Sequence, residues 1–248
     1  MLQGFRQMPS SIQIRSLEQV REVLGRDDWF GQMRHEHLDA FVSKGALRRL
    51  RPDEIFICSG DLVKSLGVVI EGTLHASRSN AAGKRHIIGY FGPLQVVNFI
   101  PILDGQRCVH DISAHHDALV LTIPKDVFLE ALDQDPAIAR AVIRVLCLRS
   151  RALYENASDN VLRPLRARCA RMLSFLMASH GKPINASVSI TLKLSQDELA
   201  DMLGRTRQSV NRELKQMERD GIISMRYSHF IIRDVQALRD LVENEGAD

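Results

Sequence analysis

One stretch near the end of the chain, residues 194–223, reads LSQDELADMLGRTRQSVNRELKQMERDGII. Ser195, followed three residues later by a glutamate, has the spacing of a capping box and predicts that a helix starts directly after it. Gly204 is suited to end that helix, and Thr206 offers an N-cap hydroxyl for a second helix that runs to about Asp220. Two helices joined by a three-residue turn that contains glycine form a helix-turn-helix.

The two faces of the second predicted helix differ in chemistry. At ~100° per residue, Val210, Leu214 and Met217 fall within an arc of roughly 60°, which indicates a packed face. A separate arc of about 140° presents guanidinium, amide and ammonium donors with almost no acid. This pattern favours base reading in the DNA major groove by the start of helix 207–220. The alternative is an ordinary charged amphipathic helix. The predicted DNA-binding residues are Thr206, Arg207, Gln208, Ser209, Asn211, Arg212 and Lys215.

The segment GRTRQSVNREL, residues 204–214, resembles the recognition segment of the Crp/Fnr superfamily of bacterial transcription regulators. The family pattern reads Gly-x-[Ser/Thr]-Arg-Glu-[Ser/Thr]-Val-x-Arg-x-Leu, and it is matched in place by Arg207, Ser209, Val210, Arg212 and Leu214. Gln208 replaces the usual glutamate, so the family's common base preference is not expected to carry over. The resemblance implies a homodimer that binds a palindromic operator in double-stranded DNA, with RNA polymerase as a further partner.

The charge distribution agrees with a DNA partner. Residues 161–220 hold 11 Lys and Arg against 6 Asp and Glu, whereas residues 1–160 hold 19 of each. The positive excess therefore coincides with the helix-turn-helix, as expected for contacts to phosphate.

Length and composition describe an ordinary globular protein. The 248 residues suffice for one to two domains with buried cores, and 45% of them are hydrophobic. No apolar run approaches the ~18 residues that a membrane helix needs, and the N-terminus lacks a signal-peptide pattern. We therefore expect a cytoplasmic protein without a membrane partner.

Short β-rich runs separated by glycine or proline occupy the first half of the chain and indicate a sandwich or barrel. They cover residues 54–58, 66–71, 86–91, 96–100, 109–113 and 118–123. The segments PDEIFICSGD (52–61) and LGVVIEG (66–72) resemble the β-roll of the family's cyclic-nucleotide-binding domain.

A long helix is predicted to begin at Asp135-Pro136 and to reach residue 154 or beyond, with a broad apolar side. In the family this helix forms a two-stranded coiled coil along the dimer axis; the alternative is that it packs only on its own β-domain. Residues 156–160 are the expected hinge. A helix over 162–180, a strand over 187–194 and a hairpin over 222–225 and 230–232 complete a winged helix.

The predicted fold class is α+β, with an antiparallel N-terminal β-roll, a long dimerisation helix and a C-terminal winged helix-turn-helix. The predicted domains are a β-roll sensor domain with N-terminal helices (1–134), the dimerisation helix and hinge (135–160), and the DNA-binding domain (161–248).

The effector pocket of the family usually holds Gly-Glu for a ribose and Arg-Ser for a phosphate. At the first position this chain has Val97-Asn98-Phe99 without an acid, and near the second Arg107 stands without a following serine. Classical cyclic AMP binding is therefore disfavoured, and Asn98 and Arg107 are the candidate effector-binding residues. The effector itself is unknown.

No metal site is predicted. The cysteines form no CxxC pair, and residues 1–57 contain no cysteine, so the iron–sulfur cluster of some family members is not expected. His115 and His116 are adjacent, so on a strand they would point to opposite faces. Whether one of the barrel histidines His75, His86 and His110 binds haem stays open.

The sequence gives less support to two other functions. A metal-dependent cupin-like enzyme would need a His-x-His and carboxylate set on strands, which is absent, and no nucleophile motif appears elsewhere. We therefore expect no enzyme. An architectural DNA-binding protein without any switch stays open, as do activation versus repression and the operator sequence.

Overall fold

A computed structural model describes residues 16–27, 29–226 and 228–244. The chain forms two compact units, and the boundary at Cys147 and Leu148 falls inside a long helix. Residues 1–15 and 245–248, which the predicted domain limits include, lie outside the described residues.

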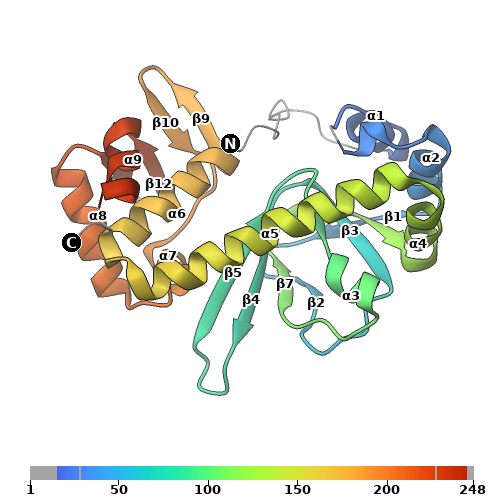
Figure 1. Cartoon of the computed structure of the whole chain (residues 1–248), viewed down its shortest axis with the longest axis horizontal. Helices are drawn as coiled ribbons and strands as arrows, with labels where there is room; N and C mark the ends of the chain where they lie inside the picture. The colour runs from blue at the N-terminus through green and yellow to red at the C-terminus, as the bar shows by residue number, and fades with distance from the viewer. Residues whose placement is uncertain (1–15, 28, 227, 245–248) are drawn as a thin grey trace. The chain divides into compact units, whose positions relative to one another are not determined.

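The first unit consists of two four-stranded antiparallel sheets with helices at its start and end (Figure 1). The strand orders are β1-β8-β3-β6 and β2-β7-β4-β5, which confirms the predicted β-roll. Its elements are α1 (Leu17–Gly25), η1 (Phe30–Gln32), α2 (His35–Ser43), β1 (Ala46–Leu50), β2 (Ile55–Ile57), β3 (Ser65–Glu71), β4 (Leu74–Ser79), β5 (Arg85–Phe91), β6 (Val96–Val97), α3 (Phe99–Asp104), β7 (Asp111–Ala114), β8 (Ala118–Pro124), α4 (Lys125–Gln134) and the first turns of α5 (Pro136–Leu162).

Two cores hold this unit together, because successive strand residues point to opposite faces. Val68 of β3 and Leu121 of β8 are fully buried in a core shared with α1, α2, α4 and the start of α5. Val69 and Val120 point the other way, into the core between the two sheets. At the β3–β4 turn, Gly72 has φ +77°, and a Cβ there would lie 2.0 Å from the backbone oxygen of Asp117, in the connection between β7 and β8.

Some expected elements differ in the structure. Residues 96–100, predicted as one strand, form the two-residue β6 and then enter α3, because Asn98 takes a left-handed conformation with φ 72°. Pro101 suits the first turn of α3. Residues 156–160, predicted as a hinge, are helical. The chain instead leaves α5 after Leu162, just ahead of Pro164, since a proline disfavours helix in the residue before it.

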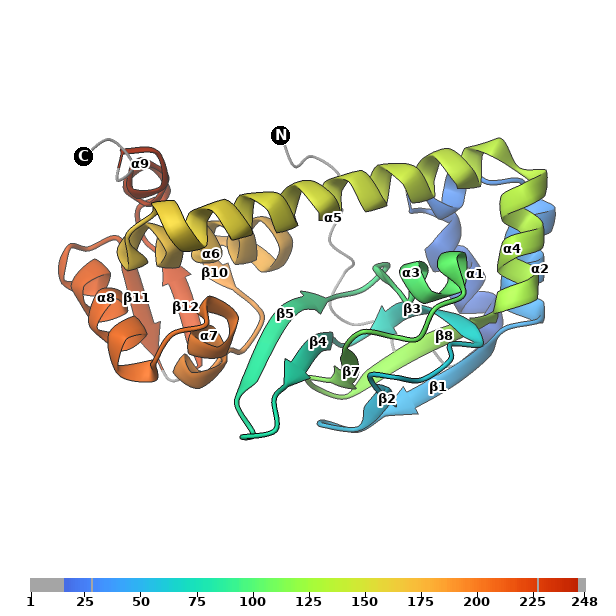
Figure 2. The same ribbon diagram turned by 60° about the horizontal axis from the view of Figure 1, so that its bottom comes forward.

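The second unit confirms the helix-turn-helix and the wing. A four-stranded sheet of order β11-β12-β10-β9 lies beside four helices and the end of α5. The elements are α6 (Leu165–His180), β9 (Gly181–Ile184), β10 (Ser187–Ile190), α7 (Gln196–Leu203), α8 (Arg207–Arg219), β11 (Ile223–Arg226), β12 (His229–Ile232) and α9 (Val235–Asn244). Within this unit α8 contacts β11, as Figure 2 shows. Among the helices of the described residues, none has both the length and the apolar character of a membrane span.

Candidate nucleic-acid interface

The ends of α7 and the start of α8 are fixed by side chains that the sequence identified. Ser195 Oγ accepts from the backbone N–H of Glu198 at 3.2 Å, and Glu198 Oε2 accepts from the N–H of Ser195 at 2.8 Å. Gly204 ends α7 with φ 62°, and Thr206 Oγ1 accepts from the N–H of Ser209 at 3.3 Å. The predicted capping box, glycine stop and second N-cap are all confirmed.

The inner face of α8 packs against the rest of the unit. Val210, Leu214 and Met217 are each at most 1% exposed. Val210 and Leu214 meet apolar side chains of α6 and α7, which include Cys169, Leu173, Leu199 and Leu203. This packing fixes which side of α8 remains outside.

The outer face of α8 carries exposed donors. Arg207, Gln208, Arg212 and Lys215 are all exposed. Arg207 lies 3.0 Å from Asp197 Oδ2, and Arg212 lies 3.2 Å from Glu213 Oε1, with the two arginine side chains 62% and 75% exposed. Surface ion pairs of this kind contribute little, so a phosphate or a base edge can replace the carboxylates at small cost.

The three remaining predicted residues lie differently. Thr206 and Ser209 hydroxyls are 2.9 Å apart and belong to the helix cap. Asn211 is half-buried, and its Oδ1 atom is buried without a hydrogen-bond partner among the described residues.

The far end of α8 is anchored by residues that the sequence did not single out. Arg166 of α6 donates to Asp220 Oδ2 at 2.5 Å, and this hydrogen bond lowers the pKa of the Asp220 carboxyl. Glu218 Oε1 accepts from the backbone N–H of Met225 at 2.8 Å and joins α8 to the wing. Arg166 and Asp220 lie 54 residues apart, so no local pattern indicated their contact.

In the β-roll, the two candidate effector residues are engaged by the protein itself. Arg107 donates to the backbone carbonyl of Gly60 at 2.7 Å. Asn98 is 6% exposed and donates to the carbonyl of Ser65 at 3.4 Å, while its Oδ1 is buried without a described partner. Each residue therefore contacts a different backbone segment.

The histidines of the roll also differ from expectation. His115 and His116 lie in the bend between β7 and β8 rather than on a strand, and their rings are 4.2 Å apart. The His115 ring also lies 5.0 Å from Tyr90, which in turn neighbours the buried His75. Within the described residues, no group of three or more His, Cys, Asp or Glu side chains is placed to hold a metal ion.

All four cysteines are free thiols. Cys58 and Cys147 are exposed, whereas Cys108 and Cys169 are buried. Burial raises the pKa of Cys169 to about 12, which makes it an inert packing residue.

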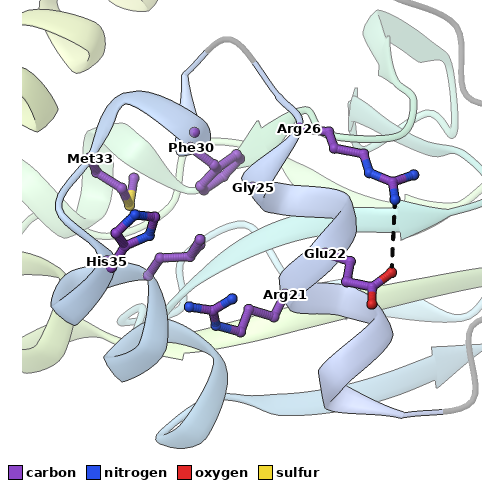
Figure 3. A pocket seen from close by; sticks show the side chains of 9 residues that line it. Arg21, Glu22, Gly25, Arg26, Phe30, Met33 and His35 are labelled. Atoms are coloured by element: carbon purple, nitrogen blue, oxygen red, sulfur yellow. Dashed lines mark ion pairs between the residues drawn. The ribbon is translucent and has the colours of Figure 1, made fainter.

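A cavity of about 270 Å³ opens among α1, η1 and α2 (Figure 3). Its charged groups are paired: Arg21 with Asp39, and Arg26 with Glu22 at 3.9 Å. The cavity contains none of the predicted site residues.

The chain matches known domains over both units. Residues 47–135 match the cyclic nucleotide-binding domain, and residues 167–241 match the Crp-like helix-turn-helix domain. The chain is 24% identical over 233 residues to the HTH-type transcriptional regulator Cmr of Mycobacterium tuberculosis (strain CDC 1551 / Oshkosh), which covers 94% of this chain and 91% of that protein. It is 22% identical over 205 residues to the transcriptional activator protein FnrL of Cereibacter sphaeroides, with 81% of each chain covered.

The solved structure of FixK2 from Bradyrhizobium japonicum has a similar fold, with a TM-score of 0.72 at 19% identity over 79% of this chain and 96% of that chain. The two domain matches occur in the order of the two units described above, and the similar proteins are regulators rather than enzymes. The chain belongs to the Crp/Fnr family of transcription regulators and carries its helix-turn-helix DNA-binding domain.

Proposed function

We propose that the protein is a homodimer that binds a palindromic operator in double-stranded DNA and reads its bases with the first two turns of α8. The observation that carries this proposal is the outer face of α8, where four exposed donors stand opposite a fully buried apolar face. The proposed contact residues are Thr206, Arg207, Gln208, Ser209, Asn211, Arg212 and Lys215.

The side chains on this face suit different parts of a DNA duplex. Arginine can donate two hydrogen bonds to guanine, and a glutamine amide can both donate to and accept from adenine. Arg207, Gln208 and Arg212 therefore suit base edges. Lys215, farther along α8, suits a phosphate. Thr206 and Ser209 lie at the N-terminus of α8, where backbone N–H groups favour a phosphate.

A surface of α5 supports dimerisation. The first turns of α5 pack on their own β-roll, since Ile138 and Val142 are at most 3% exposed. A second row of residues, at alternating spacings of four and three, lies on another side of the helix, as in a coiled coil. We call this row the α5 stripe, and it consists of Ile143, Cys147, Ser150, Tyr154, Ala157 and Val161. Ile143, Tyr154 and Val161 are 60%, 72% and 82% exposed, so a second copy would cover them.

The β-roll supports an effector site, because residues 47–135 match a cyclic nucleotide-binding domain. We propose that its effector is not cyclic AMP, since the ribose-binding acid is absent beside Asn98 and Arg107 already binds Gly60. An iron–sulfur cluster held by N-terminal cysteines is not proposed either, since residues 1–57 contain none. We propose that the protein has no catalytic activity and that RNA polymerase is a further partner. Because its proposed partner is DNA, we also propose a cytoplasmic location.

Selection from random DNA with the purified protein tests this function. We expect one enriched palindrome whose half-site centres are ~34–36 Å apart, one turn of the duplex. Enrichment of bent or AT-rich DNA without a shared motif would support an architectural protein instead. Failure to retain any DNA would contradict both functions.

A further inference from the structure

The end of α5 and the start of α6 form a polar network within the second unit. Asp159 is 8% exposed and lies 2.9 Å from Arg163 Nε and 2.8 Å from Arg171 Nε. Arg163 also donates to the backbone carbonyl of Val242 in α9. This network fixes α6 against the last turns of α5.

Arg168 extends the same network to the helix-turn-helix. Its side chain is buried, at 6% exposure, and it donates to the carbonyl of Leu203 at 2.6 Å and to Oδ1 of Asn160. Leu203 is the last residue of α7, and Asn160 lies in the last turn of α5. A single guanidinium on α6 therefore joins α5 to the end of α7.

The chemistry of this site indicates positioning rather than stabilisation. Both hydrogen-bond acceptors of Arg168 are neutral groups, and burial together with the nearby Arg205 lowers the pKa of the guanidinium. The negative end of the α7 dipole and the charge of Asp159 offset part of the desolvation cost. Buried charged groups can often be exchanged for well-packed apolar side chains at little cost in stability, so the stability of the fold does not by itself explain a buried guanidinium at this position.

The place of Leu203 suggests another reason. Leu203 directly precedes the turn at Gly204, which sets the start of α8, and the guanidinium is planar and rigid. A shift of Asn160 would therefore be passed through Arg168 to the carbonyl of Leu203 and to the reading helix.

We propose that Arg168 is a positioning residue that ties the orientation of the helix-turn-helix to the last turn of α5 through Asn160. This inference rests on the proposed reading of DNA by α8. It assigns to the Asn160–Arg168 pair the alignment of the end of α7 with the last turn of α5, beside the Asp159 ion pairs that hold α6.

The test compares two substitutions at Asn160 in the full chain with a matched control. Asn160→Leu removes the acceptor at similar volume, and Asn160→Asp keeps an acceptor oxygen. Asn156→Leu makes the same change at an exposed asparagine one turn earlier in α5. Operator affinity is measured by fluorescence anisotropy, together with the melting temperature and the dimer mass.

We expect Asn160→Leu to weaken operator binding about tenfold, within the range of typical coupling between sites, with the melting temperature and the dimer mass unchanged. Asn160→Asp and Asn156→Leu should bind within about twofold of the unchanged protein. The double variant Asn160→Leu with Arg168→Met should bind no more weakly than Arg168→Met alone, because the two residues act as one unit.

Three results would overturn the inference: equal binding by Asn160→Leu and the unchanged protein, equal losses in Asn160→Leu and Asn156→Leu, or additive losses in the double variant. Each of these leaves the proposed function intact. An unchanged protein that selects no DNA sequence would refute the proposed function and this inference with it.

Discussion

Arg207 of the helix-turn-helix and Arg107 of the β-roll are both exposed arginines, but they are held differently. Arg207 faces Asp197, whose side chain is itself 60% exposed, and this surface pair is easily exchanged. Arg107 donates to the backbone carbonyl of Gly60 at 2.7 Å and so closes a loop of the roll. Arg207, the proposed DNA contact, therefore has an internal partner that is easily exchanged, whereas Arg107 is bound to the backbone of its own unit.

The largest effect is expected at the α5 stripe, the proposed dimer surface on the helix that is shared by the β-roll unit and the helix-turn-helix unit. Replacing both Ile143 and Tyr154 with Asp should convert the dimer to monomers. The dimer would lose two apolar side chains from each copy, and each contributes ~1.5–3 kcal/mol when buried. Sedimentation equilibrium measures the mass. Operator binding should be lost with the dimer, while the melting of the β-roll should persist.

Leu148→Asp is the matched control for this change. Leu148 is 48% exposed but lies roughly 140° around the helix from Ile143, outside the α5 stripe. The Leu148→Asp variant should therefore remain dimeric. Monomers from Leu148→Asp and dimers from the stripe variant would place the dimer surface on another side of α5.

The next largest effect is expected from substituting Arg207, with Arg107 as the comparison. Arg207→Ala should weaken operator binding by ~1–3 kcal/mol per half-site, the usual discrimination of a paired contact to a base. Arg107→Ala should leave binding unchanged and lower the free energy of unfolding by about 1 kcal/mol or less, because its hydrogen bond is exposed. Anisotropy and urea denaturation measure the two quantities. Weaker operator binding by Arg107→Ala, together with unchanged binding by Arg207→Ala, would contradict the different roles proposed for the two arginines.

Asp135 gives a smaller, pH-dependent effect in the β-roll unit. It is 4% exposed; burial opposes its ionisation, but hydrogen bonds from the N–H groups of Ala137 and Arg34 outweigh burial and lower its pKa. Because the folded-state pKa lies below the unfolded one, the stabilisation is complete at neutral pH and is lost as the pH falls through the folded-state value.

Asp135→Asn should therefore destabilise the protein by about 1 kcal/mol at pH 7, because an amide has one acceptor oxygen for the two N–H groups of Ala137 and Arg34. The difference from the unchanged protein should shrink once the pH falls below roughly 4. Urea denaturation at several pH values measures it. A difference that grows in acid would contradict the sign of the shift.

The smallest effect is expected from cyclic AMP. Titration calorimetry should give no micromolar binding, because no carboxylate stands beside Asn98 to bind a ribose. Operator affinity should be the same with and without the nucleotide. Micromolar binding would show that the β-roll recognises the ribose by other groups and would contradict the proposal that its effector is not cyclic AMP.

The sequence predicted the helix-turn-helix closely because its determinants are local. Ser195, Gly204 and Thr206 each act within four residues, through a cap or a left-handed turn. The buried and exposed faces of α8 followed from helical periodicity. The anchors of this unit, Arg166 and Arg168, were not predicted, since their partners Asp220 and Leu203 lie 54 and 35 residues away.

The β-roll was predicted as a class but less well in detail. Strand β4 was missed because its sequence, LHASRS, lacks a run of β-branched residues; its pairing with β5 and β7 determines its conformation. The first two residues of α3 were included in the strand predicted over 96–100, because a short apolar run fits either structure. The role of Arg107 depends on Gly60, 47 residues earlier, and no local pattern indicates that contact.

Selection from random DNA with Gln208→Glu and Lys215→Ala tests most directly whether α8 reads bases. Gln208→Glu should change the preferred base at one symmetric pair of operator positions, because a carboxylate only accepts hydrogen bonds, with ~1–3 kcal/mol of discrimination at stake. Lys215→Ala should weaken binding to all sequences alike and lower the salt slope by about one. An unchanged motif with Gln208→Glu, together with a rewritten motif for Lys215→Ala, would contradict the docking of α8 in the major groove.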